Sequence, residues 1–432
     1  MPPRPPTVRS RFRCAWHWGF SLGVIGSAVL APAQSASSRA GEPLLVCLVS
    51  AEAKAEELHR ALAETLGRNS TVTLAPKHPD GTLSLAPLRT AHTAVFHCGP
   101  GALGTEDAAV LREFLAAGRG VVVLAAAHDA WDAVPNFLGE YLGAEPGGRF
   151  AAGAPMSVIN LYPHPIYAGV ERFETQQPMP VWQKIAADAQ LIMEGTVGEE
   201  TAPLAWVRRR STGRVCHLVP AGAALFSDAA YLQIVAHAVL WTSSRPIPQA
   251  QPIVQRTFMP ESYPGSFAIT FPGGPGVCFD PVRGGINFIW DGDFVDLRPR
   301  WLTKQGEPAR IFGEVFYRES MWQPWRVGAP GREPVFQFRG YRLTSAGPEF
   351  HYQVDDREVF ETLSASADGR GLERRFRVGA GGGPLWLHLE PQRDSDLTLT
   401  GLVRDGDRAT LASSAAGAFT IEIRRKPVSA LP

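Results

Sequence analysis

Charge imbalance and cysteine motifs are both missing from this sequence, and each absence removes a class of protein. Lys plus Arg and Asp plus Glu number 42 each among the 432 residues, so no bulk field recruits nucleic acid or an anionic membrane. The five cysteines form no CxxC or CxxCH motif, so we expect no attached haem and no resident cofactor. We expect the cysteines beyond the N-terminal region to be buried as small hydrophobes: Cys47, Cys98, Cys216 and Cys278.

Long apolar runs are also missing, except near the N-terminus. Arginines precede the apolar stretch Phe20–Leu30, and Ala31-Pro32-Ala33 places small residues where a signal peptidase reads them. This pattern predicts a secretory signal over residues 1–33, a periplasmic or secreted mature protein, and no stable membrane insertion after the signal is removed. An uncleaved membrane anchor is the alternative. No other run reaches the roughly 18 apolar residues that a spanning helix needs.

The segment Ala91–Asp132 organises our interpretation of the fold. Thr93–His97 is a short apolar run ended by Gly99-Pro100-Gly101, an amphipathic helical pattern follows, and Gly120–Ala127 is a continuous apolar run. Strand, helix and buried strand in this order are typical of a parallel βαβ unit. Ligands bind beyond the carboxyl ends of such strands, so His128 is the first candidate for a site residue.

The flanking segments extend this pattern into an α/β flavodoxin-like doubly wound sheet. Pro43–Ser50 is expected to be an earlier strand, and Ser50 is expected to cap a helix with leucines at four-residue spacing. Ser227–Trp241 is expected to close this part of the chain as a helix. Three strand candidates between residues 189 and 219 indicate an antiparallel addition to the sheet.

Beyond residue 257 the helical periodicity disappears, and short alternating segments recur between Gly, Pro and Asp turns. Segments of this kind predict an all-β sandwich-type domain. The expected organisation is a signal peptide at 1–33, a loose mature N-terminus at 34–42, an α/β domain at 43–242, a Pro/Gln-rich linker at 243–257 and an all-β domain at 258–432.

Several short motifs occur in a fixed order along the expected α/β domain. They are Gly118 and Gly120 before the apolar strand, His128, the stretch His164–Gly169, Pro203–Trp206 followed by Gly213–Val215, and the terminal Val239–Trp241. Together they resemble the ThuA-like (trehalose utilisation) family, a branch of the class I glutamine-amidotransferase-like superfamily. The resemblance implies a sugar or keto-sugar ligand and a role in carbohydrate metabolism.

A second set of motifs lies in the expected all-β domain: Phe271–Gly274, Cys278–Asp280, Trp290–Leu297 and Gly313–Tyr317. This set is similar to a β-rich module found beside cytochrome and sugar-dehydrogenase domains in large secreted bacterial proteins. The resemblance implies polymer or sugar breakdown and a secreted protein partner, such as a cytochrome or dehydrogenase.

Two histidines are the candidate catalytic residues. His128 and His164 both follow strand ends, so they could meet across one crevice, with Asp129 orienting an imidazole. A neutral histidine there could remove a proton next to a ketone. The alternative is that His128 caps a helix and His164 makes a backbone hydrogen bond in a rigid Pro-flanked turn. We expect no metal site, because two histidines and one aspartate without i, i+4 spacing are too few ligands.

Four aromatic residues could stack against sugar rings: Trp131, Tyr162, Tyr167 and Trp182. Packing beneath the crevice as core is the alternative for them. We expect His97, His217 and His237 to be structural, because they lie in expected strand or helix interiors.

The leading interpretation is a secreted ThuA-like protein that recognises or processes a sugar or keto-sugar, with any activity of the lyase or isomerase type. A cysteine-dependent amidotransferase is disfavoured, because the turn after the central strand is Ala126-Ala127-His128 and has no thiol. The alternative is a non-catalytic binding or assembly module of a secreted complex. The family's later Leu-Gly-His histidine is missing, which favours the alternative, whereas His128 and His164-Pro165 favour the first interpretation.

Overall fold

The computed structural model describes residues 42–427 apart from short internal segments. Those segments are 100, 105–106, 125–130, 132–133, 135–136, 150–157, 176–179, 198–199, 211–212, 221, 249, 293–294, 300–305, 322, 329–331 and 412–415. The chain is mostly β, with a mixed parallel and antiparallel sheet and several antiparallel sheets. None of the described helices is long and apolar enough to cross a membrane.

The mixed sheet has eight strands in the order β2-β1-β3-β4-β10-β9-β8-β6. The first five of that order are parallel, and the last three add antiparallel. The strands are β1 (Leu44–Ser50), β2 (Ser70–Leu74), β3 (Thr93–His97), β4 (Gly120–Leu124), β6 (Val158–Leu161), β8 (Ala189–Val197), β9 (Glu200–Arg210) and β10 (Gly213–Leu218). β3 and β4 are buried along their whole length, as central parallel strands with both faces covered should be.

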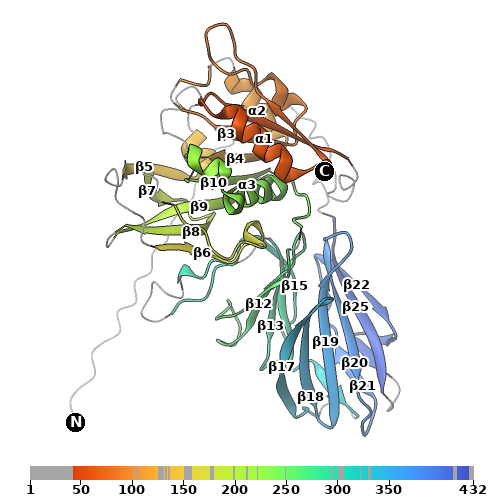
Figure 1. The fold of residues 1–432 in the computed structure, drawn as a ribbon. Helices are drawn as coiled ribbons and strands as arrows, with labels where there is room; N and C mark the ends of the chain where they lie inside the picture. Colours follow the sequence, from red (N-terminus) through yellow and green to blue (C-terminus); the bar gives the residue numbers. More distant parts are fainter. Residues whose placement is uncertain are drawn as a thin grey trace, which may run out of the picture. The chain divides into compact units, whose positions relative to one another are not determined.

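Helices cover both faces of the parallel strands. α1 (Ala55–Leu66) and α3 (Ala229–Thr242) lie side by side on one face, and α2 (Ala108–Ala116) lies on the other (Figure 1). Successive residues of a strand point to opposite faces, so Val46 belongs to the core beneath α1 and α3, whereas Cys47 belongs to the core beneath α2. The sheet therefore separates two apolar cores.

Three local expectations differ from the structure. The N-cap of α1 is Lys54 rather than Ser50. α3 begins after Asp228, whose carboxylate accepts a hydrogen bond from the Tyr231 amide at 2.8 Å, so the helix starts two residues later than expected. The pattern of Asp132–Leu142 predicts a short helix broken by Pro135. Within it, Leu138–Leu142 forms the single π-helical turn η5, and Arg208 donates to its Glu140 carbonyl at 2.6 Å.

Two strands form a small antiparallel pair beside the mixed sheet. β5 (Ala144–Arg149) pairs with β7 (Pro180–Ile185), and the register shifts within the pairing. Neither strand was expected from the sequence. In β5 the alternation of apolar and polar residues that marks a strand is interrupted by Pro146 and by two glycines.

The later part of the chain forms three antiparallel sheets. The five-stranded sheet holds β11 (Ile253–Arg256), β12 (Phe267–Thr270), β13 (Gly276–Asp280), β14 (Gly285–Asp291) and β15 (Glu314–Arg318). The six-stranded sheet runs β17 (Phe336–Thr344), β18 (Gly347–Val354), β19 (Arg357–Ala365), β20 (Gly371–Val378), β25 (Gly417–Arg425) and β22 (Ser395–Thr400). The four-stranded sheet runs β16 (Trp325–Val327), β21 (Leu385–His388), β24 (Arg408–Leu411) and β23 (Val403–Asp405).

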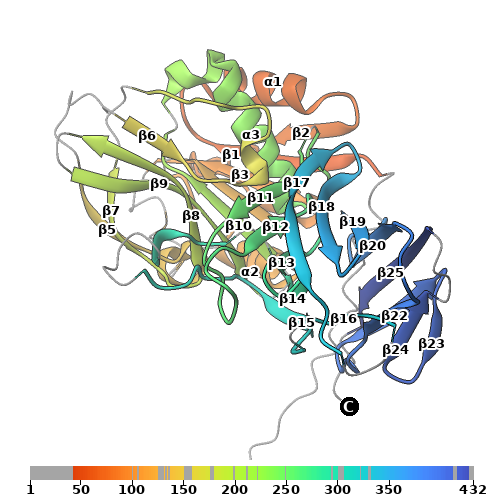
Figure 2. The same cartoon turned by 90° about the horizontal axis from the view of Figure 1, so that it is seen from below.

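One apolar core joins these three sheets. It includes Phe279 of the five-stranded sheet, Phe350 of the six-stranded sheet and Trp325 of the four-stranded sheet. Figure 2 shows the broad ribbon of β17, β18, β19 and β20 that supplies one side of this core. β11 lies inside the segment that was expected to be a linker. Its residues have no local strand pattern, and they form a strand because they pair with β12.

Candidate functional site

The carboxyl ends of β1 and β3 bring a serine and a histidine together. Ser50 is the last residue of β1, His97 is the last residue of β3, and the parallel register places them opposite each other. Ser50 Oγ and His97 Nδ1 share a hydrogen bond at 3.2 Å. Their side chains are 3% and 9% exposed, so the pair lies just beneath the surface of this edge.

This pairing explains why the expected helix cap is wrong. Ser50 lies four residues before the N-cap Lys54, and the Ser50 hydroxyl bonds to His97 and to the Glu52 amide at 3.4 Å. His97 was expected to be structural because the apolar run around it indicated a strand interior. Its position as the last residue of β3 instead places its imidazole at the edge where α/β sheets bind ligands.

A carboxylate lies next to this pair. Glu52 is exposed, and a Cβ atom built on Gly99 would lie 2.8 Å from Glu52 Oε1, so the carboxylate reaches across from the end of β1 to the end of β3. An ordinary side chain at position 99 would displace it. The edge therefore presents a hydroxyl, an imidazole and a carboxylate from two adjacent strands.

Cys98 lies beside these residues but is not an activated nucleophile. Its thiol donates to the Val49 carbonyl at 3.2 Å. Burial, with a smaller contribution from the charge of Glu52, raises the pKa of Cys98 to about 12. A thiol held protonated at neutral pH does not support cysteine-based hydrolysis at this edge.

A third strand end contributes an apolar wall. The ring of Phe226, in η7 (Ala223–Ser227) after β10, meets the His97 imidazole edge to face, with centroids 5.2 Å apart. This contact fixes the orientation of the His97 ring, as does the hydrogen bond to Ser50. Both contacts come from segments far from His97 in the sequence.

His128 and Asp129 lie outside the described residues. The strand that leads to them, β4, ends at Leu124, at the same carboxyl edge of the sheet as Ser50 and His97.

His164 lies toward the opposite end of the parallel strands. Its ring meets Trp241, near the end of α3, with centroids 5.4 Å apart, and its Nδ1 accepts from the Ile166 amide at 3.3 Å. The end of α3 adjoins the amino end of β4, because a Cβ atom built on Gly120 would lie 2.6 Å from the Thr242 carbonyl. The His164 imidazole acts as the N-cap of η6 (Pro165–Tyr167), as the alternative interpretation described.

The four predicted aromatic residues do not share one surface. Trp131 stacks on Phe137 in the core beneath α2, with centroids 3.8 Å apart, whereas Trp182 packs against Trp206 and belongs to the core beneath α1 and α3. Tyr167 also belongs to the core beneath α1 and α3, and burial raises its pKa. Only Tyr162 among them is half-buried, and its phenol donates to the Glu194 carboxylate.

The described cysteines are all unpaired and buried. Burial raises the pKa of Cys47 and Cys278 to about 12 and raises the pKa of Cys216 as well. In the part of the chain that the structure describes, no group of three or more His, Cys, Asp or Glu side chains is arranged to hold a metal ion.

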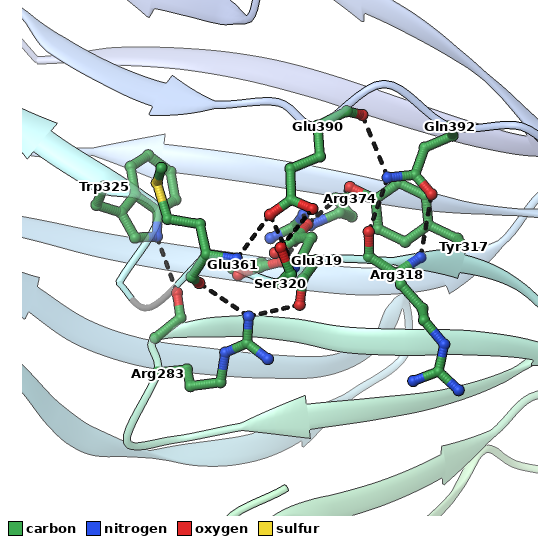
Figure 3. Close-up of polar contacts among 12 residues, drawn as sticks. Arg283, Tyr317, Arg318, Glu319, Ser320, Trp325, Glu361, Arg374, Glu390 and Gln392 are labelled. Carbon is green, nitrogen blue, oxygen red and sulfur yellow. Dashed lines mark hydrogen bonds and ion pairs between the residues drawn. The ribbon is translucent and has the colours of Figure 1, made fainter. Parts of the chain in front are cut away.

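A buried ionic cluster, which the sequence analysis missed, lies within the core of the later β sheets (Figure 3). Arg374 of β20 bonds through Nε to Glu361 and through Nη1 to Glu319, both at 2.7 Å. Tyr317 and Tyr352 donate to these two carboxylates at 2.8 Å. Burial raises the pKa of Glu319, and the Arg374 charge opposes that rise.

The same region fixes the chain just after β15. Arg283 donates through Nη2 to the carbonyls of Glu319 and Met321, and the amides of Ser320 and Met321 donate to the Glu390 carboxylate at 2.7 and 2.6 Å. Figure 3 shows Glu390 above Ser320. The Arg374 guanidinium lies close to the carboxylates of both Glu319 and Glu361. Because the three ionic groups are enclosed and paired, we assign this cluster a structural role.

A sequence signal for the cluster does exist. Arg374 shares its face of β20 with the buried Leu372 and Phe376, and Glu361 shares its face of β19 with Val359 and Leu363. Period-two counting therefore places both charges on the inward face, where an unpaired charge would be costly. Opposite charges at inward positions of neighbouring strands are the pattern that predicts such a pair.

Comparison with known proteins identifies no family for this chain. No family model matches the chain, and no curated protein matches it in sequence. The solved structures that it resembles include the cytoplasmic protein STM1381 from Salmonella typhimurium LT2, with 14% identity, 46% of this chain and 97% of that chain covered, and a TM-score of 0.34. The carbohydrate deacetylase Agd3 is 13% identical over 51% of this chain and 35% of its own, with a TM-score of 0.36. Likenesses this weak carry no argument about fold or function.

Proposed function

We propose that this chain is a secreted ThuA-like protein that binds a sugar or keto-sugar at the carboxyl ends of β1 and β3. The observation that carries the proposal is the Ser50–His97 hydrogen bond at that edge, with the exposed Glu52 carboxylate beside it. The predicted signal over residues 1–33 supports a periplasmic or secreted location. The motif resemblance supports the sugar class.

The strand order supports this position for the ligand. The parallel strands run β2-β1-β3-β4-β10, which is the flavodoxin-like order, and the helices after β1 and after β3 cover opposite faces. The order reverses between β1 and β3, and ligands of doubly wound sheets bind where it reverses. In the proposed architecture this α/β domain is followed by an all-β sandwich-type domain.

The side chains at this edge suit a polyhydroxylated ligand. The Glu52 carboxylate accepts hydrogen bonds from sugar hydroxyls, and the Ser50 hydroxyl and His97 imidazole each donate or accept according to the tautomer. An imidazole or carboxylate placed here can also remove the proton next to a ketone and return it to the neighbouring carbon. Isomerase- or lyase-type chemistry on a keto-sugar is the activity that this set of groups supports.

One observation favours a second candidate function. Ser50 and His97 are 3% and 9% exposed, so a substrate reaches them only if the edge opens. A binding or assembly module needs no such opening, because Glu52 alone contacts solvent freely. In that case the chain binds its ligand or a secreted partner without turnover.

A thermal-shift screen distinguishes a sugar site at this edge from a module that binds only a protein partner. The protein without its predicted signal is tested with disaccharides and their 3-keto derivatives, alongside the variants His97→Gln and Glu52→Gln and the exposed control Glu64→Gln. A ligand at a hundred times its dissociation constant stabilises by about 2.7 kcal/mol, a shift of several degrees. We expect the shift in the wild type and in the control, and its loss in both site variants. A shift that survives in both variants, or no shift with any sugar, contradicts the proposal and directs the search to protein partners.

A further inference from the structure

Two tyrosines stand nearly half exposed along one side of the later β sheets. Tyr263 precedes β12 and is 48% exposed, and Tyr341 of the edge strand β17 is 45% exposed. β12 and β17 belong to different sheets, and both views show them close together (Figures 1 and 2). Few large apolar side chains are exposed in the described part of the chain, so two tyrosines at one place need an explanation.

The Tyr263 backbone is held firmly although its ring is exposed. Its amide donates to Asp280 Oδ2 at 3.0 Å, and its carbonyl accepts from the amide and the hydroxyl of Ser266 at 2.9 and 2.7 Å. Asp280 and Ser266 are themselves buried. The exposed ring is therefore presented by a fixed backbone, which lowers the entropy lost when a ligand stacks on it.

Tyr341 is packed on one side and open on the other. Its ring centroid lies 5.0 Å from that of Phe267 and 5.9 Å from that of Phe350. Both phenylalanines belong to the buried core, so they fix the tyrosine ring from below. The exposed side of the ring faces solvent.

Arg256 of β11 lies beside Tyr263 and near Phe267, the residue on which the Tyr341 ring packs. Its guanidinium lies 6.0 Å from the centroid of the Phe267 ring, and its Nε donates to the Gly265 carbonyl at 3.2 Å. A Cβ atom built on Gly265 would lie 3.0 Å from Arg256 Nη2 and 3.4 Å from Tyr263 Cε1, so the guanidinium neighbours the Tyr263 ring. Arg256 is exposed and makes no ion pair with an acid among the described residues.

We propose that Tyr263, Arg256 and Tyr341 form a binding surface, the tyrosine platform, for an anionic oligosaccharide. Tyrosine rings supply flat apolar faces for the C–H faces of sugar rings, and the phenols add hydrogen bonds at their edges. A guanidinium without an acidic partner is complementary to a carboxylate or sulfate, which it binds in a fork of two N–H donors. The charge of Arg256 is what selects an acidic glycan over a neutral one.

The platform is independent of the Ser50–His97 site. It uses no residue of the mixed sheet, so it works whether that sheet catalyses a reaction, binds a small sugar or does neither. A protein with both sites would hold a polymer at the platform while small sugars reach the mixed sheet.

The test is a titration of the full chain with oligogalacturonate, compared with a neutral cello-oligosaccharide of the same length and with single-stranded DNA. Variants Tyr263→Ala, Tyr341→Ala and Arg256→Gln remove the platform groups, and Tyr263→Phe retains the ring. Val403→Ala and Arg404→Gln change an exposed apolar residue and an exposed arginine elsewhere. Thermal unfolding of each variant shows whether it folds.

We expect oligogalacturonate to bind, each removal to weaken binding at least about tenfold, and the two controls to bind as the wild type does. Tyr263→Phe keeps the ring and loses only the phenol hydrogen bond, so it should weaken binding less than Tyr263→Ala does. Equal binding by Arg256→Gln, or equal binding of the neutral oligosaccharide, would overturn the anionic class of ligand. Tighter binding of DNA than of any glycan, or no binding at all, would overturn the proposal as a whole. None of these outcomes depends on His97 or Glu52. Failure of the tyrosine platform can therefore be distinguished from failure of the proposed sugar site.

Discussion

His97 Nδ1 lies 3.2 Å from Ser50 Oγ, and these two residues end neighbouring parallel strands that are 47 positions apart in the sequence. The contact joins the first strand of the mixed sheet to the third along the chain. It also lies where the strand order reverses. A structural hydrogen bond and a candidate ligand site therefore share the same two side chains.

Ser50→Ala should lower the free energy of unfolding by about 1 to 3 kcal/mol, because it leaves the buried His97 Nδ1 without its partner. Chemical denaturation monitored by fluorescence measures the change. The exposed Ser227→Ala serves as the control and should change stability little. A Ser50→Ala protein as stable as the control would show that the hydrogen bond is not formed in solution.

Arg374→Met should cost about 3 to 5 kcal/mol at neutral pH, because Glu319 and Glu361 remain buried without their cation. Burial raises the pKa of Glu319, and a carboxyl with a raised folded-state pKa loses stability as pH rises from its unfolded value toward its folded value. The deficit should therefore shrink at acidic pH. Arg375→Met, on the exposed face of β20, is the matched control. A deficit that stays constant from acid to neutral pH would contradict the assignment.

His237→Gln should weaken the loss of stability on acidification. His237 Nδ1 and the Ile166 carbonyl lie 3.0 Å apart, and burial lowers the pKa of His237. Between the unfolded pKa near 6.5 and the lowered folded pKa, the unfolded chain binds more protons, so stability falls as pH falls through this window. Urea denaturation at several pH values measures the slope, and glutamine keeps a donor for the carbonyl. An unchanged slope would mean that other groups cause the acid sensitivity.

The buried thiols should resist modification in the folded protein. Burial raises the pKa of Cys47, Cys98 and Cys278 to about 12, so almost no thiolate is present at pH 8. Ellman's reagent should react with these residues only after denaturant is added. Because the described cysteines are unpaired, a reducing agent should leave Tm unchanged. Rapid reaction of the native protein at Cys98, identified by mass spectrometry, would show that the carboxyl edge opens.

Gly120→Ala should destabilise the mixed sheet by about 1 to 3 kcal/mol. The added Cβ would lie 2.6 Å from backbone atoms of Thr242, and neither β4 nor the end of α3 is a flexible side chain that can give way. Gly139→Ala is the control, because a Cβ atom there would meet nothing within 4 Å. Thermal unfolding compares the two variants. Equal Tm values would show that α3 is displaced easily from the end of β4.

The sequence alone determined the elements whose signal is local. The apolar run Thr93–His97 and the alternating run Phe336–Thr344 match β3 and β17, and the leucines at four-residue spacing lie on α1. Alternation of period two and helical spacing are properties of neighbouring residues, so they can be recognised in a short segment without the rest of the chain. The same counting could have placed Glu361 and Arg374 on inward faces.

Tertiary structure alone decided which side chains meet. Ser50 matched a helix cap locally, but the register of β1 against β3 turned its hydroxyl to His97. His164 followed a strand as predicted, yet the packing of η6 along α3 carried it toward Trp241 and away from the carboxyl edge. Pairing register and helix packing depend on contacts across long stretches of chain, and such contacts leave no pattern in the residues beside each partner. For this reason the sequence could predict the kind of sheet but not the pair of residues at its edge.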